Sequence, residues 1–251
     1  MKRVFDESKP ELMDVPQPVS PELERDLANL VSLNRWFGSH WLICRFLFAW
    51  LQPGTNYRIL DLATGSGDIP RLIANWCAKR GITVQIDAVD GSAATLEIAR
   101  RQSARYANIQ WIQADALTYD SGQTYDLVFC TLALHHFSEE NAIKLLQRCR
   151  RLSHHYVLVS DLERSMATYA GVWLLTALIY RDPMTQHDGR MSARRAFSWW
   201  ELRQMAQAAG WEHFGQERFL FCRQAIWLSE RELGGIPVEA EPLPHVLPCP
   251  S

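Results

Sequence analysis

Carboxylates and glycines recur just after apolar stretches of the chain, and this combination can bind a positively charged nucleotide derivative. The run from Asp61 to Asp68 holds a Gly-x-Gly turn between an apolar stretch and a helical pattern. Glycines in such a turn let the backbone approach a ligand closely. Asp68 falls at the start of the helix, where its charge would repel a pyrophosphate. Together with Asp61 it favours a cationic or zwitterionic ligand over a dinucleotide.

S-adenosylmethionine is such a ligand, because it carries a sulfonium, an ammonium and one carboxylate. Asp90 ends the second predicted strand, where a carboxylate can accept hydrogen bonds from ribose hydroxyls. Asp115 follows the third, where its side chain or the neighbouring backbone can meet the adenine amino group. An aspartate after a strand is often only a turn or cap residue, but three at successive strand ends favour a binding site. The residues expected to contact the cofactor are Asp61, Ala63, Gly65, Gly67, Asp90, Gly91, Asp115, Ala116, Thr131 and, through the methionine carboxylate, Arg35.

Histidines supply the candidate catalytic groups. Methyl transfer from a sulfonium is an in-line displacement that mainly needs alignment, while a hydroxyl acceptor also needs a base, for which histidine is suited. His135 and His136 directly follow the fourth predicted strand, and His187 precedes Asp188 in a polar stretch. The alternatives are structural hydrogen bonding for the first two and a surface turn for the third. For Arg35, the alternative is an arginine lying along an amphipathic helix.

The elements that must position these residues alternate between strand and helix, which indicates an α/β fold with a parallel sheet. Strands are expected at 57–63, 83–89, 109–113, 125–132 and 156–160, and helices at 69–80, 93–104 and 139–151. Two helices fit between Pro21 and Leu51, an apolar helix fits 166–180, and 181–192 reads as a polar, glycine-containing loop. A helix at 199–209 precedes two strand-like runs, 211–219 and 223–228, which lie too close for a crossover and should pair antiparallel.

The composition restricts the classes of protein to which this chain can belong. The chain has 251 residues and a formal net charge of −2, which gives no electrostatic footprint for nucleic acid. Six single cysteines favour a reducing cytoplasm over a disulfide framework. The start of the chain lacks an apolar signal segment, and the apolar runs are too short for stable membrane insertion. We expect a flexible arm at 1–20, a helical cap at 21–53, a core at 54–233 with a cap insertion near 165–197, and a proline-rich tail at 234–251.

Aromatic residues gather outside the predicted sheet. Trp36, Phe37 and Trp41 lie on the N-terminal helices and Trp173 on the later apolar helix. Such stripes are often core, but together they can also line a pocket for a bulky apolar acceptor such as an alkylated phenol or a quinol.

The motifs Asp61-x-x-x-Gly65-x-Gly67-Asp68, Val89-Asp90-Gly91, Ala114-Asp115-Ala116 and Tyr125-Asp126-Leu127-Val128 resemble those of class I S-adenosylmethionine-dependent methyltransferases. The resemblance implies a Rossmann-like seven-stranded sheet in the order 3-2-1-4-5-7-6, with the last strand antiparallel and helices on both faces. Shorter segments resemble the ubiquinone/menaquinone-type subgroup, near methyltransferases associated with type III polyketide (phenolic lipid) pathways. These segments are 33–38, 160–165, 187–189 and 194–197.

The resemblance implies methyl transfer to a small hydrophobic acceptor, and we expect it to be the hydroxyl of a phenolic or polyketide-derived compound. C-methylation of a quinone precursor is the alternative. Weaker alternatives are methylation of RNA or protein and a catalytically inactive cofactor-binding partner subunit. No acidic set of metal ligands is evident in the sequence. We expect a cytoplasmic monomer or homodimer that binds no nucleic acid.

Overall fold

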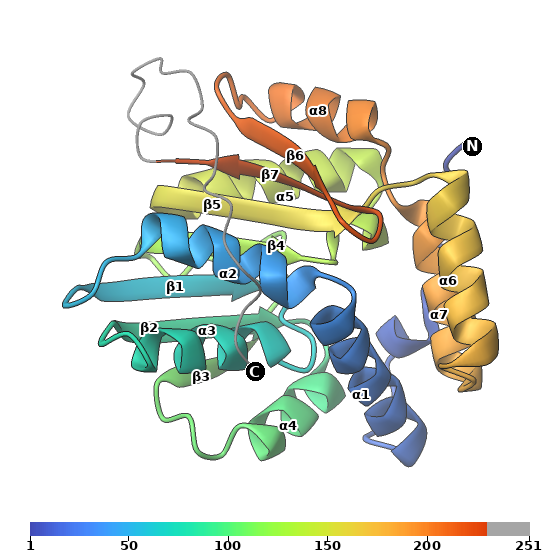
Figure 1. The fold of residues 1–251 in the computed structure, drawn as a ribbon, viewed down its shortest axis with the longest axis horizontal. Coiled ribbons are helices and arrows are strands. Elements are labelled where there is room, and N and C mark those ends of the chain that lie inside the picture. Colours follow the sequence, from blue (N-terminus) through green and yellow to red (C-terminus); the bar gives the residue numbers. More distant parts are fainter. Residues whose placement is uncertain (230–251) are drawn as a thin grey trace.

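Seven strands form one sheet in the order β3-β2-β1-β4-β5-β7-β6 (Figure 1). The computed structural model describes residues 1–229. The strands are β1 (Asn56–Leu62), β2 (Thr83–Asp90), β3 (Ile109–Gln113), β4 (Tyr125–Thr131), β5 (Ser153–Leu162), β6 (Gly215–Phe219) and β7 (Arg223–Leu228). β7 runs antiparallel to both β5 and β6, and the other pairs are parallel. The predicted sheet order and the closing hairpin are confirmed.

Helices cover both faces of this sheet. Successive strand residues point to opposite faces, so Ile59 packs in one core cluster and Leu60 in the other. The first cluster lies under α2 (Ser39–Trp50) and α3 (Asp68–Ala78), and the second under α5 (Glu139–Leu152) and α8 (Trp199–Ala208). α4 (Ala93–Gln102) packs along β2 and β3. α2, which lies in the expected helical cap, therefore packs on one face of the sheet.

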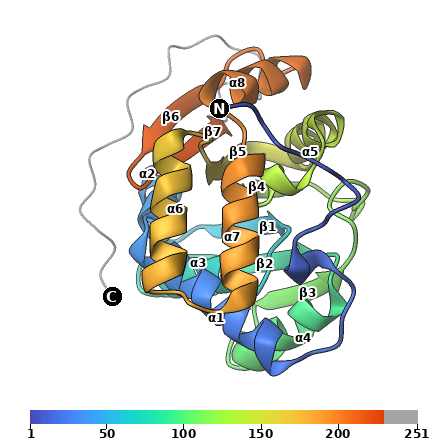
Figure 2. The ribbon, with the colours of Figure 1, turned by 90° about the vertical axis from the view of Figure 1, so that its right-hand side faces the viewer.

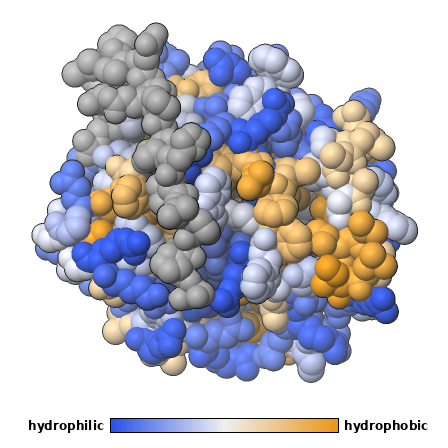
Figure 3. All heavy atoms as spheres, in the orientation of Figure 1, coloured by the Kyte–Doolittle hydropathy of each residue, from blue (hydrophilic) through white to orange (hydrophobic). Residues whose placement is uncertain are grey.

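Three helices stand beside the end of the sheet where the parallel strands finish. They are α1 (Pro21–Trp36), α6 (Met166–Leu178) and α7 (Pro183–Arg195), and α6 and α7 lie side by side (Figure 2). Most of the exposed residues of α6 are apolar, including Met166, Trp173, Leu174 and Leu178. Figure 3 shows apolar side chains gathered over this part of the molecule. Among residues 1–229, no helix is long and apolar enough to cross a membrane.

The loop predicted at 181–192 is wrong, because α7 occupies almost all of it. Asp182 caps this helix by accepting hydrogen bonds from the N–H groups of Met184 and Thr185, and Pro183 fills the first helical position. Gly189, which suggested a turn, lies inside the helix. A Cβ atom there would come 3.4 Å from Val172 on α6, so the glycine allows the two helices to pack closely.

The N-terminal segment runs along α7 and the strand ends (Figure 2). It was expected to be a flexible arm, and its regular structure is one short 3-10 turn, Leu12–Asp14. It is nevertheless anchored: the N–H groups of Leu12 and Met13 donate to the carboxylate of Asp188 at 2.8 and 2.9 Å. Arg3 donates to the backbone oxygens of Arg195 and Phe137. We call residues 1–20 the arm. The tail at 234–251 lies outside the described residues, and the expected domain boundaries stay predictions.

Candidate active site

Asp61 lies near the end of β1, fully buried beside the glycine turn. The Thr64 hydroxyl donates to its Oδ2 atom at 2.6 Å. Its Oδ1 atom is buried and has no hydrogen-bond partner among the residues that the structure describes. Burial raises the pKa of Asp61 to about 7, and the charges of Asp68 and Asp90 act in the same direction. A buried acceptor of this kind is suited to a cationic donor.

Asp90 ends β2 and holds the glycine turn in place. One of its carboxylate oxygens accepts the N–H of Gly65 at 2.8 Å, and the other accepts the N–H of Ser92 at 2.9 Å. Burial raises the pKa of Asp90, and the two backbone hydrogen bonds oppose this. Gly65 and Gly67 both have positive φ angles. A Cβ atom on Gly67 would lie 2.2 Å from the Trp111 ring, whereas nothing lies within 4 Å of one on Gly65.

The other expected cofactor residues fall into two groups. Ala63 follows β1 in the left-handed backbone region, Gly91 follows β2, and Thr131 ends β4, so these lie at the same edge of the sheet as Asp61 and Asp90. Asp115 is exposed and accepts the N–H of Leu117 at 2.9 Å, as a turn residue does, and Ala116 is buried in the core.

Asp68, at the start of α3, contacts side chains of both α1 and α2. Its Oδ2 atom accepts the side-chain amide of Asn34 at 3.0 Å and lies 3.2 Å from Nε2 of His40. Arg35 next to Asn34 is exposed, and its guanidinium lies over the ring of Trp36. The structure thus brings Asn34 and His40, rather than Arg35, to the acidic start of α3.

His135 is fully buried and paired with a carboxylate that the sequence analysis did not single out. The two histidines lie on the 3-10 turn Leu134–His136, directly after β4. Nδ1 of His135 lies 2.7 Å from Oδ1 of Asp161 on β5, and the backbone N–H of His135 donates to the other oxygen at 2.9 Å. Burial alone would raise the pKa of Asp161, but the charge and hydrogen bonds of His135 outweigh it and lower that pKa.

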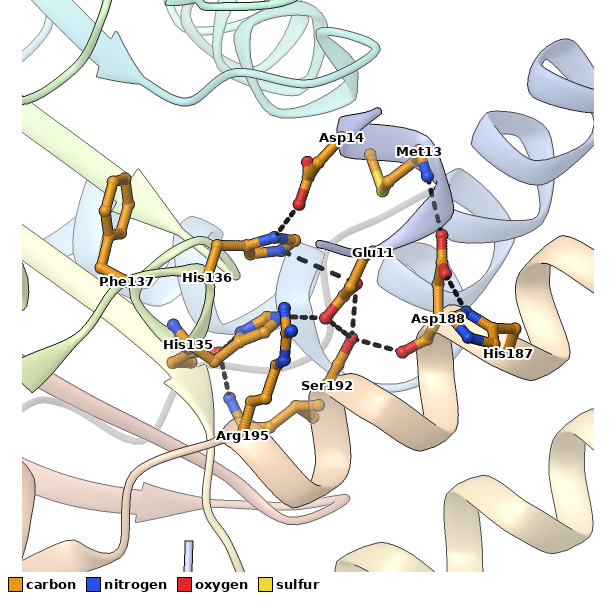
Figure 4. Close-up of polar contacts among 12 residues, drawn as sticks. Glu11, Met13, Asp14, His135, His136, Phe137, His187, Asp188, Ser192 and Arg195 are labelled. Carbon is orange, nitrogen blue, oxygen red and sulfur yellow. Dashed lines mark hydrogen bonds and ion pairs between the residues drawn. The ribbon is translucent and has the colours of Figure 1, made fainter. Parts of the chain in front are cut away.

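His136 is paired with the arm. Its Nδ1 atom lies 2.6 Å from Oδ2 of Asp14 (Figure 4). Burial would lower the pKa of His136, but Glu11 and Asp14 outweigh it and raise the pKa to about 9. Asp14 raises the pKa of Asp90 and His136 lowers it, so the effects of the pair on the acid at the end of β2 oppose each other. The sequence analysis did not predict four residues of this site, which are Glu11, Asp14, Asp161 and Ser192. Of these, only Asp161 had a local signal of function, because it directly follows a predicted strand.

His187 does not join this pair. It lies on α7, with Nδ1 2.7 Å from Asp188, and in Figure 4 it lies on the far side of Asp188 from His135 and His136. Nearly half of its side chain is exposed, whereas Asp188 is buried and anchors the arm.

The four aromatic residues expected around the acceptor lie in different surroundings. Trp41 packs against the first core cluster, under α2 and α3, and its ring centroid lies 5.9 Å from that of Phe219. Phe37 contacts Phe221 edge to face at 5.5 Å. Trp36 is exposed, and Trp173 is about half exposed beside Arg190. The core alternative therefore holds for Trp41.

Comparisons with known proteins agree with this geometry. Residues 59–155 match a family model described as a methyltransferase domain. The chain is 38% identical over 81 residues to a 2-phytyl-1,4-naphtoquinone methyltransferase of Thermosynechococcus vestitus, covering 32% of this chain and 35% of that protein. It is 34% identical over 98 residues to a ubiquinone/menaquinone biosynthesis C-methyltransferase of Coxiella burnetii, covering 38% and 35%. The chain thus spans about a third of the length of the curated relatives it matches.

A solved structure shares the fold. The plantazolicin methyltransferase BamL, determined in complex with a triazolic desmethylPZN analog and SAH, has a TM-score of 0.62 and 14% sequence identity. The likeness covers 82% of this chain and 88% of that one. The residues that match the methyltransferase-domain model, 59–155, include the glycine turn, Asp90 and both histidines after β4.

Proposed function

We propose that this chain, which carries a class I S-adenosylmethionine-dependent methyltransferase domain, transfers a methyl group to the hydroxyl of a small hydrophobic phenolic compound. The observation that carries the proposal is the pair of carboxylate-backed imidazoles after β4. His135 is backed by Asp161 and His136 by Asp14.

The residues at the ends of β1 and β2 fit S-adenosylmethionine. The unpartnered Oδ1 atom of Asp61 is suited to the ammonium of the methionine portion. Asp90 is suited to ribose hydroxyls, and the open space at Gly65 lets the backbone approach the ligand. When bound, this cofactor supplies an activated methyl group on a sulfonium. Arg35 as a partner of its carboxylate stays a prediction, which Arg35→Ala tests through cofactor affinity.

The chain's own contribution to the chemistry is to align the acceptor and to take its proton. Asp161 accepts from Nδ1 of His135, which leaves Nε2 as the atom able to receive a proton. With the cofactor bound, the acceptor oxygen would take the methyl group and release the sulfonium as a neutral thioether. Nε2 of His135 would hold the proton released by the hydroxyl.

An apolar acceptor is supported by the surface beside the site. α6 exposes Trp173, Leu174 and Leu178 next to α7, which contributes Asp188 and Ser192 to the site. Quinones of the kind named for the relatives have flat, conjugated rings, and a phytyl chain such as the one named for the first relative is hydrophobic. Location in the cytoplasm, lack of nucleic-acid binding and the monomeric or dimeric state stay predictions.

C-methylation of a quinone precursor is the second candidate, and the names of the two relatives favour it. His135 would serve it as the base in the same way, because removing a ring hydroxyl proton makes the neighbouring ring carbon more nucleophilic. The two reactions differ in the product: O-methylation consumes the hydroxyl, whereas C-methylation leaves it free.

Turnover with a panel of alkylphenols and demethylated quinols tests both candidates. Mass spectrometry detects the added methyl group, and acetylation of the product counts its free hydroxyls. A product with one hydroxyl fewer supports the proposal, and a product with all hydroxyls free supports the second candidate. If the chain binds the cofactor and methylates no member of the panel, both candidates are rejected in favour of the remaining alternative, a catalytically inactive cofactor-binding partner subunit.

A further inference from the structure

Three side chains capable of binding a metal ion converge where the arm crosses the turn after β4. Nε2 of His135 lies 3.9 Å from Oε1 of Glu11, and Nε2 of His136 lies 3.9 Å from its Oε2 (Figure 4). The candidate ligand atoms of the three residues all lie within 4.8 Å of one another. Two imidazoles and one carboxylate are a common ligand set for divalent transition metals.

Both imidazoles are oriented for this role by a second carboxylate. Asp161 lies 2.7 Å from Nδ1 of His135, and Asp14 lies 2.6 Å from Nδ1 of His136. A carboxylate on the far nitrogen of a metal-binding histidine fixes the ring and makes it a stronger ligand. In each ring it is therefore Nε2 that faces Glu11.

Glu11 is buried and short of hydrogen-bond donors. Only 2% of its surface is exposed. The Ser192 hydroxyl lies 2.9 and 3.0 Å from its two oxygens, but the same hydroxyl also lies 2.8 Å from the backbone oxygen of Asp188. The single hydroxyl proton of Ser192 cannot be donated fully to both Glu11 and Asp188. The Nε2 atoms of the two histidines are too far from the Glu11 carboxylate to donate hydrogen bonds to it. A buried carboxylate in this state is stabilised by a cation.

The surrounding charges also favour a cation. Four carboxylates lie in this cluster, those of Glu11, Asp14, Asp161 and Asp188. Two guanidiniums lie near them, but Arg3 donates to the backbone oxygens of Arg195 and Phe137, and Arg195 donates to those of Asp6 and Lys9.

We propose that Glu11, His135 and His136 bind a divalent transition-metal ion, of the class of Zn²⁺ or Co²⁺, through one carboxylate and two Nε2 atoms. Ligand bonds of roughly 2.0–2.2 Å around a tetrahedral ion separate the ligand atoms by about 3.3–3.6 Å. The three side chains would therefore have to move closer together than the 3.9 Å of the two nitrogen–oxygen pairs and the limit of 4.8 Å for the whole group. Three protein ligands leave at least one position open to water or to an oxygen of a bound molecule.

Metal binding goes beyond the proposed function and does not depend on it. The ion would tie the arm to the turn after β4 and thereby stabilise the fold. It would also occupy both Nε2 atoms, so that in the loaded protein an acceptor hydroxyl would be activated at the open position rather than by a histidine base.

Calorimetry and Co²⁺ absorption spectra of the full chain, stripped of metal with a chelator, test the site. A second group, Asp126, His154 and His155, could hold an ion at the surface. All measurements therefore use a His154→Ala/His155→Ala background, in which this second group is removed. We expect one equivalent of Co²⁺ or Zn²⁺ per chain and a higher melting temperature with metal.

Two variants and one matched control decide the outcome. Glu11→Gln and His136→Ala should each weaken binding at least about tenfold. His187→Ala removes a neighbouring histidine that is not a proposed ligand, and it should bind as the background does. Circular dichroism verifies that each variant is folded, and a variant that has unfolded is replaced by His135→Gln. Less than one equivalent bound by the background protein, or unchanged affinity in folded Glu11→Gln, overturns the proposal.

Discussion

The Nδ1 atom of His136 lies 2.6 Å from a carboxylate oxygen of Asp14, although 122 residues separate the two in the chain. This contact joins the arm to the turn after β4, and Glu11 lies beside it. The candidate active site is thus assembled from two parts: acids at the ends of β1 and β2, and imidazoles completed by residues that precede the whole sheet in the sequence.

Asp188→Ala should release the arm, because the N–H groups of Leu12 and Met13 would lose the carboxylate that accepts them. Hydrogen bonds to a charged group contribute about 1.5–3 kcal/mol each. Hydrogen exchange of these two amides should therefore accelerate at least about tenfold. Glu140→Ala removes an exposed carboxylate that pairs with Lys144 and should leave their exchange unchanged. Equal exchange in all three proteins would show that Asp188 does not hold the arm.

Cofactor affinity should increase with pH up to about neutrality. The pKa of Asp61 is raised to about 7, chiefly by burial, so below pH 7 the folded protein holds this carboxyl protonated. Binding the ammonium of S-adenosylmethionine requires the ionised form and must release that proton. Affinity should fall by up to about tenfold per pH unit below 7. Calorimetry from pH 5.5 to 8 measures this slope.

Asp61→Asn is the matched control for that pH dependence. It keeps the size of the side chain and removes its titration, so affinity should be lower and nearly independent of pH in this range. A slope equal to that of the unchanged protein would assign the pH dependence to another group and remove Asp61 from the ammonium site.

Gly67→Ala and Gly65→Ala should fail in different ways. Both positions have positive φ, which costs a side chain about 1–2 kcal/mol. At Gly67 the new Cβ would also meet the Trp111 ring at 2.2 Å, and such overpacking adds about 1–3 kcal/mol. Gly67→Ala should therefore lose more unfolding free energy in denaturant titrations. A Cβ atom on Gly65 would point into open space, so Gly65→Ala should mainly weaken cofactor binding. If Gly65→Ala lost more unfolding free energy than Gly67→Ala, the roles given to the two glycines would be contradicted.

Asp161→Asn should slow turnover while leaving cofactor affinity unchanged. The carboxylate fixes which nitrogen of His135 carries the proton, and an amide in its place no longer selects that tautomer. Positioned proton transfer contributes about 10²–10⁴-fold to a rate, so a decrease of about 10²-fold in kcat is expected. Steady-state kinetics and calorimetry on one preparation separate the two effects. An unchanged kcat with a folded protein would remove His135 from the reaction.

Local patterns were sufficient for most of the elements. Ile59 and Leu60 lie in an apolar run of strand length, and the helical stretches between such runs predicted parallel pairing. The strand order came from the resemblance to class I methyltransferases, and the structure confirms it. The error at 181–192 came from Gly189 and the polar side chains around it. A helix there is stabilised by the cap at Asp182 and by packing against α6, and packing is not visible in a short window of sequence.

By itself, the sequence determined the individual strands, the glycine turn and the acids after β1 and β2, because each depends on residues close together in the chain, while the order of the strands followed from the resemblance to a known family. Only the tertiary structure decided that Glu11 and Asp14 face the two histidines, that Asp161 supports His135, and that Trp41 packs in the core. Those contacts join segments far apart in the sequence. Their physical basis is the burial of charged groups that must find partners once the chain is compact, and no local pattern records which partner each will find.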